Sequence, residues 1–143
     1  MDKNYTGTDS NCFACGEHNK DGLHLKFATL TDSVEALMSQ KKHQGWDDII
    51  HGGIISTMLD EAMSHAIFRH RDATVVTAEM TVRFVAPLRV GRNIKITGKI
   101  VSERGRVIET EAEIIDLDDS NTVAKSKGRF VMITLPQEMP ELR

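Results

Sequence analysis

The 143-residue sequence predicts one α+β domain with a single long helix and about six strands. Residues 53–68 carry apolar residues at helical spacing, whereas the segments on either side alternate apolar and polar residues with a period of two. No internal repeat, low-complexity tract or linker divides the chain. We therefore expect residues 1–143 to form one domain.

The elements before the helix are short. Residues 1–20 are polar and rich in turn-forming residues, which indicates a loosely helical lead-in. The Asn-Lys-Asp-Gly run at 19–22 predicts a turn. Residues 23–27 and 34–39 alternate and predict two strands, and a polar loop at residues 40–50 then leads to the helix.

Residues 53–68 form the long helix. At about 100° per residue, its apolar side chains cover roughly half of the circumference. A narrower polar stripe holds Thr57, Asp60, Glu61 and Ser64. A helix with so wide an apolar face is expected to be buried along most of its length.

The segments after residue 73 predict strands joined by turns. They are residues 75–85, 93–101, 107–117 and 122–135. One long helix and about six strands have one efficient arrangement, in which a curved antiparallel sheet wraps around the helix, and this is the hot-dog architecture. Its short edges and remaining apolar surface favour pairing with a second copy of the chain.

The composition argues against several classes of function. A net charge of −3 gives no general case for binding nucleic acid or a membrane surface. No apolar run approaches the ~20 residues that span a bilayer, and the first residues lack the apolar core of a signal peptide. We therefore expect a cytoplasmic protein that binds neither nucleic acid nor membrane.

Cys12 and Cys15 are the only cysteines, in a Cys-x2-Cys spacing. Such neighbours make no disulfide framework, and cytosolic thiols stay reduced. A zinc site completed by His18 and His24 is one interpretation. The gap between these histidines exceeds the usual finger spacing and no second Cys-x2-Cys pair follows, so a turn that packs two small thiols is favoured.

The start of the helix indicates acyl-transfer or hydrolytic chemistry. Gly52 and Gly53 offer backbone N–H groups at a helix N-terminus, where they can bind an oxygen that becomes negative. Asp60 and Glu61 lie on the same apolar helix, and a buried carboxylate is costly unless it is paired or used. For Asp60 the structural alternative is a carboxylate that pairs with a basic side chain or caps a neighbouring loop.

Several motifs resemble the hot-dog thioesterases of the phenylacetate-pathway (PaaI-like) branch. His51-Gly52-Gly53 with residues 59–63 (Leu-Asp-Glu-Ala-Met) is similar to the helix signature of this family. Residues 77–91 resemble its next strand and Pro-x3-Gly turn, and residues 12–16 (Cys-Phe-Ala-Cys-Gly) resemble its N-terminal signature. The similarity extends over residues 12–135. It implies an acyl-CoA thioesterase, with coenzyme A as part of the substrate and no metal or redox cofactor.

The resemblance also implies roles for individual residues. The acidic residue nine positions after the histidine, Asp60, acts as nucleophile or general base, with Glu61 as the fallback. The backbone N–H of Gly53, or alternatively of Gly52, polarises the thioester carbonyl. Thr77 matches a hydroxyl position that assists the acid or its water.

Other candidates have weaker signals. His51 is a possible general acid, although its place just before the helix favours a capping role. Some relatives carry an asparagine a few residues before this histidine, where the chain has Gly45 with Gln44 beside it, and Gln44 is the candidate substitute for substrate binding. Basic residues at strand ends or on the last strand are candidates for the phosphates of coenzyme A, with a solvated surface position as the alternative. They are Arg104, Arg106, Lys125, Lys127 and Arg129.

The spacing of the site residues predicts an oligomer. Gly53 and Asp60 lie about 10 Å apart along a helix axis, whereas an oxyanion donor and an attacking group must both lie within roughly 3 Å of one carbonyl. Two antiparallel helices related by a two-fold axis bring Gly53 of one protomer to Asp60 of the other. We therefore expect a homo-oligomer, either a dimer or a pair of dimers.

Two other functions compete with the thioesterase. A non-catalytic acyl-CoA-binding regulator needs an attached DNA-binding segment, and residues 1–20 are neither basic nor long enough for one. A hot-dog dehydratase or hydratase usually pairs a histidine with an acid in a different motif. Here His51-Gly52-Gly53 and Asp60 resemble the thioesterase pattern, which favours the thioesterase over the dehydratase or hydratase.

Overall fold

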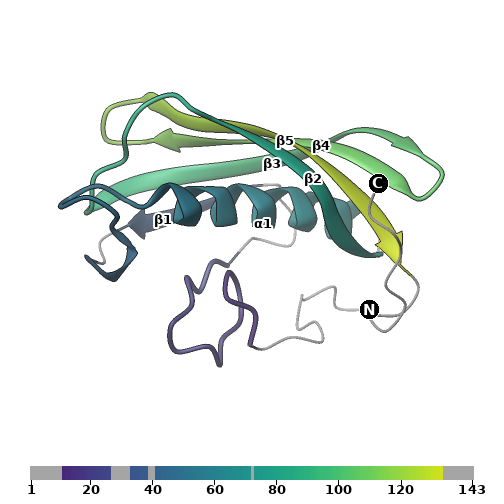
Figure 1. The fold of residues 1–143 in the computed structure, drawn as a ribbon, viewed down its shortest axis with the longest axis horizontal. Coiled ribbons are helices and arrows are strands. Elements are labelled where there is room, and N and C mark those ends of the chain that lie inside the picture. Colours follow the sequence, from purple (N-terminus) through teal and green to yellow (C-terminus); the bar gives the residue numbers. More distant parts are fainter. Residues whose placement is uncertain (1–10, 27–32, 39–40, 72, 134–143) are drawn as a thin grey trace.

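The computed structural model describes residues 11–26, 33–38, 41–71 and 73–133. One helix, α1 (Gly52–Arg71), packs against an antiparallel sheet of five strands, so the fold is α+β (Figure 1). A short 3₁₀ helix, η1 (Lys41–His43), precedes α1. The strands are β1 (Ser33–Met38), β2 (Thr74–Phe84), β3 (Arg92–Arg104), β4 (Val107–Asp116) and β5 (Asn121–Ile133).

The predicted strand at residues 23–27 is wrong for the part that the structure describes. Residues 23–26 belong to no strand, and residue 27 lies outside the described residues. Their alternation has another cause, because Leu25 is buried in the core and Leu23 packs against it from a loop. The backbone N–H groups of Leu23 and Leu25 donate to the carbonyls of Phe13 and Ala14. We call residues 11–26 the N-terminal loop.

The predicted helical lead-in also differs from the structure. Residues 1–10 lie outside the described residues, and residues 11–20 form turns. The other five predicted strands and the long helix are confirmed, although α1 continues to Arg71 rather than ending at residue 68. Residues 39, 134 and 135, at the ends of two predicted strands, lie outside the described residues.

The strand order is β1-β3-β4-β5-β2, and all neighbouring strands are antiparallel. The last three strands in the sequence, β3, β4 and β5, form a meander. β2 precedes them in the sequence but pairs with β5, so it lies at an edge of the sheet. The sheet covers one side of α1, and the N-terminal loop lies on the opposite side (Figure 1).

The helix approaches the sheet closely at a glycine of β3. A Cβ atom at Gly98 would lie only 2.3 Å from the carbonyl oxygen of Ala62 in α1. Because no side chain fits in this space, glycine allows the helix backbone to approach the strand. This contact sets the depth at which the middle of α1, including Asp60, sits against the sheet.

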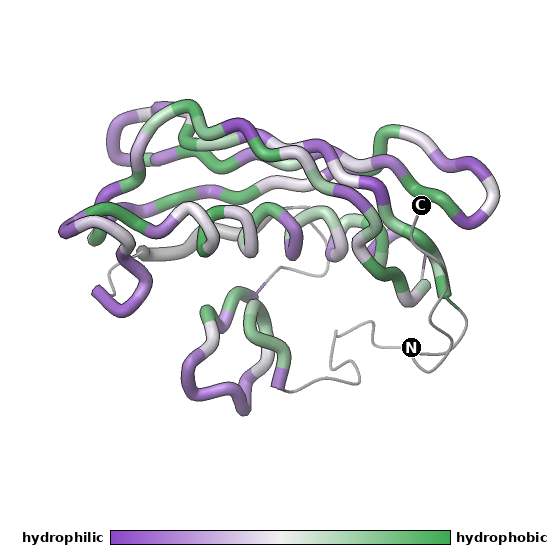
Figure 2. The backbone as a smooth tube through the Cα atoms, viewed as in Figure 1, coloured by the Kyte–Doolittle hydropathy of each residue, from purple (hydrophilic) through white to green (hydrophobic). Residues whose placement is uncertain are grey.

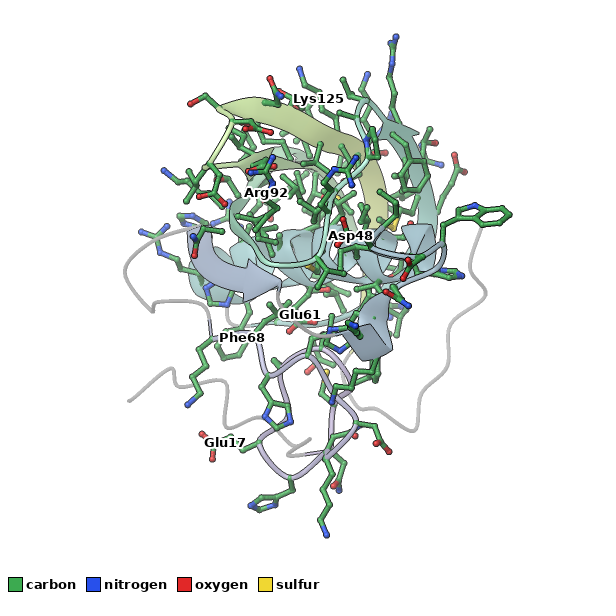
Figure 3. The ribbon with its side chains drawn as sticks, turned by 90° about the vertical axis from the view of Figure 1, so that its left-hand side faces the viewer. Glu17, Asp48, Glu61, Phe68, Arg92 and Lys125 are labelled. Carbon is green, nitrogen blue, oxygen red and sulfur yellow. The ribbon has the colours of Figure 1, made fainter. Side chains whose placement is uncertain are left out.

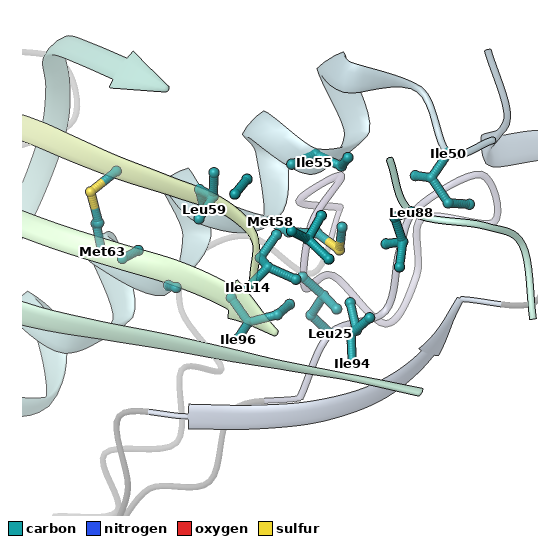
Figure 4. Close-up of a cluster of buried hydrophobic side chains, with 14 of the residues drawn as sticks. Leu25, Ile50, Ile55, Met58, Leu59, Met63, Leu88, Ile94, Ile96 and Ile114 are labelled. Carbon is teal, nitrogen blue, oxygen red and sulfur yellow. The ribbon is translucent and has the colours of Figure 1, made fainter. Parts of the chain in front are cut away.

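The core fills the space between α1 and the sheet (Figure 4). Met58 and Met63 of α1 are fully buried in it. Figure 2 shows hydrophobic and hydrophilic residues alternating along the strands and a hydrophilic stretch in the N-terminal loop. Within the described part of the chain, no helix is both long and apolar enough to cross a membrane.

Candidate active site

Asp60 lies in the middle of α1 and reaches β2. The Thr77 hydroxyl Oγ1 donates a hydrogen bond to Asp60 Oδ1 over 2.7 Å, and both side chains are half-buried. None of the described basic side chains forms an ion pair with Asp60. Burial raises the pKa of Asp60 above its ordinary value, and the hydrogen bond from Thr77 acts in the opposite direction.

Thr77 occupies an irregular position in β2. The register between β2 and β5 shifts between Thr77 and Glu79, which marks a β-bulge. A bulge changes the direction in which the neighbouring side chains point. Here the residue beside it directs its hydroxyl group toward the helix. The pairing of Asp60 with Thr77 thus depends on the packing of α1 and on a local distortion of the edge strand.

Glu61 points away from β2, toward the N-terminal loop (Figure 3). Burial raises the pKa of Glu61, a hydrogen bond with Cys15 lowers it, and the charge of Asp60 raises it further. Burial is also the main reason that the pKa of the Cys15 thiol is raised, with Glu61 adding to the effect. The two adjacent acids therefore have different partners: Thr77 contacts Asp60, and Cys15 contacts Glu61.

His51 caps the N-terminus of α1. Its Nδ1 accepts a hydrogen bond of 2.8 Å from the Gly53 N–H, and its carbonyl oxygen accepts from the N–H groups of Ile54 and Ile55. The N–H that we expected to polarise the carbonyl, that of Gly53, is thus occupied by the imidazole. The Gly52 N–H has no acceptor among the described residues.

An apolar pocket of ≈ 710 Å³ opens beside the helix start. Its walls come from the loop before α1, from Gly52 and Ile55 of the helix, and from the end of β2 with the residues that follow. Three large apolar side chains of its lining are exposed, Trp46 at 84%, Phe84 at 53% and Val85 at 52%. A pocket of this kind fits an apolar ligand group or the surface of another protomer.

Gln44 lies in the loop that precedes the pocket. Its Oε1 accepts a hydrogen bond of 3.2 Å from the Asp48 backbone N–H, and Arg89 forms an ion pair with the Asp48 carboxylate over 2.9 Å. The Gln44 side chain, which we expected to bind substrate, therefore uses its amide oxygen to hold this loop in its present conformation.

Two of the basic residues expected at the phosphates of coenzyme A have partners within the chain. Arg106 donates two hydrogen bonds, of 3.0 and 2.9 Å, to the Met132 carbonyl oxygen. Arg129 forms an ion pair of 2.8 Å with Glu109. The three others, Arg104, Lys125 and Lys127, are exposed.

Three potential metal ligands lie together beneath α1. One ligand atom each of Cys12, Cys15 and Glu61 lies within 4.8 Å of the other two, and all three residues are half-buried. His18 and His24, which the sequence offered as partners of the cysteines, are exposed and outside this group. Sequence reasoning missed Glu61 in this role because only the packing of the loop against α1 brings it to the cysteines.

Comparison with known proteins identifies the family of the chain. Residues 48–123 match the family model of the thioesterase superfamily. The chain is 35% identical over 91 residues to an uncharacterized protein of Schizosaccharomyces pombe, covering 61% of this chain and 52% of that protein. It is 31% identical over 86 residues to a candidate esterase of Saccharolobus solfataricus, covering 59% of this chain and 55% of that protein. The chain thus matches about half the length of each relative.

The fold has similar solved structures. One is a Bacillus halodurans protein crystallised with CoA, with a TM-score of 0.66 and 24% identity over 76% of this chain and 71% of that chain. This similarity shows a shared hot-dog fold. Because the family match covers more than half of the residues, the chain belongs to the thioesterase superfamily.

Proposed function

We propose that the protein is an acyl-CoA thioesterase of the PaaI-like branch, with Asp60 as nucleophile or general base. The observation that carries this proposal is the half-buried Asp60 carboxylate, which Thr77 holds over 2.7 Å while no described basic side chain pairs with it. A structural ion pair, one of the alternative roles for Asp60, has no support in the described residues. Membership of the thioesterase superfamily agrees with the proposal.

The surroundings of Asp60 suit a base. Because burial raises the pKa of Asp60, its carboxylate accepts a proton more readily than an exposed aspartate does. As a general base, Asp60 takes a proton from water while the water oxygen bonds to the carbonyl carbon. The carbon–sulfur bond then breaks, and the coenzyme A thiolate leaves and takes up a proton. As a nucleophile, Asp60 forms an anhydride that water hydrolyses to the same products.

The start of α1 supplies the donor for the carbonyl oxygen. The Gly52 N–H needs no rearrangement, because it has no acceptor among the described residues. The Gly53 N–H, the donor that the family resemblance implies, becomes available when the His51 imidazole moves away from it. Both N–H groups lie at the positive end of the helix dipole, where a developing oxyanion is stabilised.

The complete site needs a second protomer. Asp60 and the helix start of one chain are about 10 Å apart along α1. The 11-residue strand β2 lies at an edge of the sheet. An edge strand presents backbone N–H and C=O groups that can pair with a strand of another chain. Pairing of two copies through β2 would set their helices antiparallel, with the helix start of one protomer near Asp60 of the other. We propose a homodimer of this kind, alone or paired into a tetramer.

The test is the release of free thiol from a panel of aromatic and aliphatic acyl-CoA substrates. We expect Asp60→Asn to lower kcat by about 10²–10⁴-fold. Glu61→Gln is the matched control, because it removes the adjacent carboxylate that faces the N-terminal loop, and we expect it to retain most of the activity. Near-wild-type turnover by Asp60→Asn would overturn the assignment. Tight acyl-CoA binding by the wild-type protein without thiol release would favour a non-catalytic binding module instead.

A further inference from the structure

The N-terminal loop places two thiols against a carboxylate of α1. Sγ of Cys12, Sγ of Cys15 and a carboxylate oxygen of Glu61 all lie within 4.8 Å of one another. Two sulfurs bound at about 2.3 Å to one tetrahedral zinc ion are about 3.8 Å apart. Small side-chain rotations therefore suffice to bring the three groups onto one ion.

The turn that presents the thiols is ordered by backbone hydrogen bonds. The Gly16 N–H donates to the Cys12 carbonyl oxygen over 2.8 Å and closes the Cys-x2-Cys turn. The backbone bond from Leu23 to Phe13, also 2.8 Å, ties the same turn to the far side of the loop. Leu25, at 4% exposure, anchors the loop in the core. The cysteines are thus held at the helix by contacts that do not involve their sulfur atoms.

The charges around Glu61 leave a position for a cation. In the described part of the chain no lysine, arginine or histidine forms an ion pair with Glu61. The charged neighbour on the helix is Asp60, which has the same sign. Thiolates select soft ions such as Zn²⁺ over Mg²⁺ and Ca²⁺. Two thiols and one carboxylate form a three-residue zinc donor set, with the fourth tetrahedral position open to water.

We propose that Cys12, Cys15 and Glu61 bind one Zn²⁺ ion per chain, which fastens the N-terminal loop to α1 beside Asp60. Binding releases the two thiol protons to solvent and forms two zinc–sulfur bonds and one zinc–oxygen bond. This donor set differs from the Cys2His2 set that was one interpretation of the sequence. His18 is exposed, and His24 directs its Nε2 to the Asn19 carbonyl oxygen. The site does not depend on the proposed thioesterase activity.

The experiment is a metal titration of the full-length, reduced protein. Co²⁺ serves as a spectroscopic probe, because cobalt bound to thiolates shows a ligand-to-metal charge-transfer absorption. We expect one equivalent of Co²⁺ to bind with this absorption and Zn²⁺ to displace it. Cys12→Ser and Cys15→Ser should each abolish the absorption, and Glu61→Gln should weaken binding at least about tenfold. The control variant His18→Ala/His24→Ala should bind as the wild-type protein does.

Three results would overturn the proposal. The first is that the reduced wild-type protein shows no thiolate-bound cobalt. The second is that Glu61→Gln binds as tightly as the wild type, which would remove Glu61 from the site. The third is that the double histidine variant loses the metal. Far-UV circular dichroism checks that the serine variants fold. If the serine variants do not fold, the titration of the wild-type protein still shows whether the thiols bind the metal. The assay does not measure thioester turnover, so its outcome is independent of the proposed enzyme activity.

Discussion

At the scale of single residues, Asp60 and Glu61 show how two adjacent acids acquire different chemistry. Asp60 accepts a hydrogen bond from Thr77 on β2, whereas Glu61 faces Cys15 of the N-terminal loop. Burial raises the pKa of both carboxyl groups. The two acids lie on one helix and both are half-buried, so these features do not distinguish them. What distinguishes them is the contacting residue, which is Thr77 for Asp60 and Cys15 for Glu61.

The Thr77 hydroxyl should control the pH dependence of turnover. Its hydrogen bond lowers the pKa of Asp60 against the effect of burial. A base must be deprotonated, so kcat should fall as the pH decreases through this pKa. Thr77→Val removes the donor while keeping the side-chain shape, and we expect the acidic limb of the kcat profile to shift to higher pH. Thr77→Ser should keep the wild-type profile. An unchanged acidic limb in the valine variant would contradict this role.

The buried carboxylate of Asp60 should lower the stability of the fold. A raised folded-state pKa stabilises the protein below the unfolded-state pKa, and this stabilisation is lost as the pH rises through the folded-state pKa. At neutral pH, Asp60→Asn should therefore raise the melting temperature, since asparagine still accepts the Thr77 hydrogen bond. The difference should shrink as the pH falls through the raised folded-state pKa, and it should vanish below the ordinary range for aspartate. Calorimetry across this range checks it, and a destabilised variant at neutral pH would be the opposite result.

At the scale of elements, hydrophobic periodicity identified α1 and five strands. It was misleading at residues 23–26, because Leu23 and Leu25 point into the core from a loop and so imitate a strand. The approach of α1 to Gly98 was not predictable, since a single glycine in an alternating segment does not show what packs against it. This contact fixes where the helix lies against the sheet.

The helix–sheet contact can be tested by adding one methyl group. In Gly98→Ala, the new Cβ meets the Ala62 carbonyl oxygen at 2.3 Å, and the backbone must move. We expect a loss of about 3 kcal/mol in the free energy of unfolding, the upper part of the range for overpacking. Gly128→Ala is the comparison variant, because its new Cβ meets side-chain atoms only, the Met63 sulfur at 2.8 Å and the Phe130 ring at 2.9 Å, and these can shift without moving the helix backbone. It should cost about 1 kcal/mol. Equal losses in urea unfolding would contradict the account.

The N-terminus of α1 allows one backbone N–H to be removed at a time. Gly52 is the first residue of α1, where proline is well tolerated. Gly52→Pro should lower kcat/KM about 10²-fold by removing a carbonyl donor. Gly52→Ala keeps the N–H and places its Cβ 3.4 Å from the Phe84 ring, an ordinary contact, so it should remain active. If Gly52→Pro keeps its activity and Gly53→Pro loses it, the donor is Gly53 and the His51 imidazole must move.

At the scale of the whole molecule, the sequence predicted an α+β fold and a site divided between two chains. It did not show that Arg106 and Arg129 have partners within the chain, because those contacts reach neighbouring strands of the sheet, whose order was unknown. The contact of Cys15 with Glu61 was not predictable either, because it depends on how the N-terminal loop packs against α1. The carboxylate, the hydroxyl that contacts it and the helix start could be proposed from the sequence because they belong to contiguous motifs. The proposal that they meet at one substrate depends on a second copy of the chain.

The shared site is tested most directly by mixing two inactive variants. Asp60→Asn is co-expressed with whichever proline variant of the helix start abolishes turnover. A mixed dimer has one site with both defects and one site with neither. Since random pairing makes about half of the dimers mixed, we expect thioesterase activity to return to about a quarter of the wild-type value. If the mixed dimers form and remain inactive, each site lies within a single chain and the account is wrong.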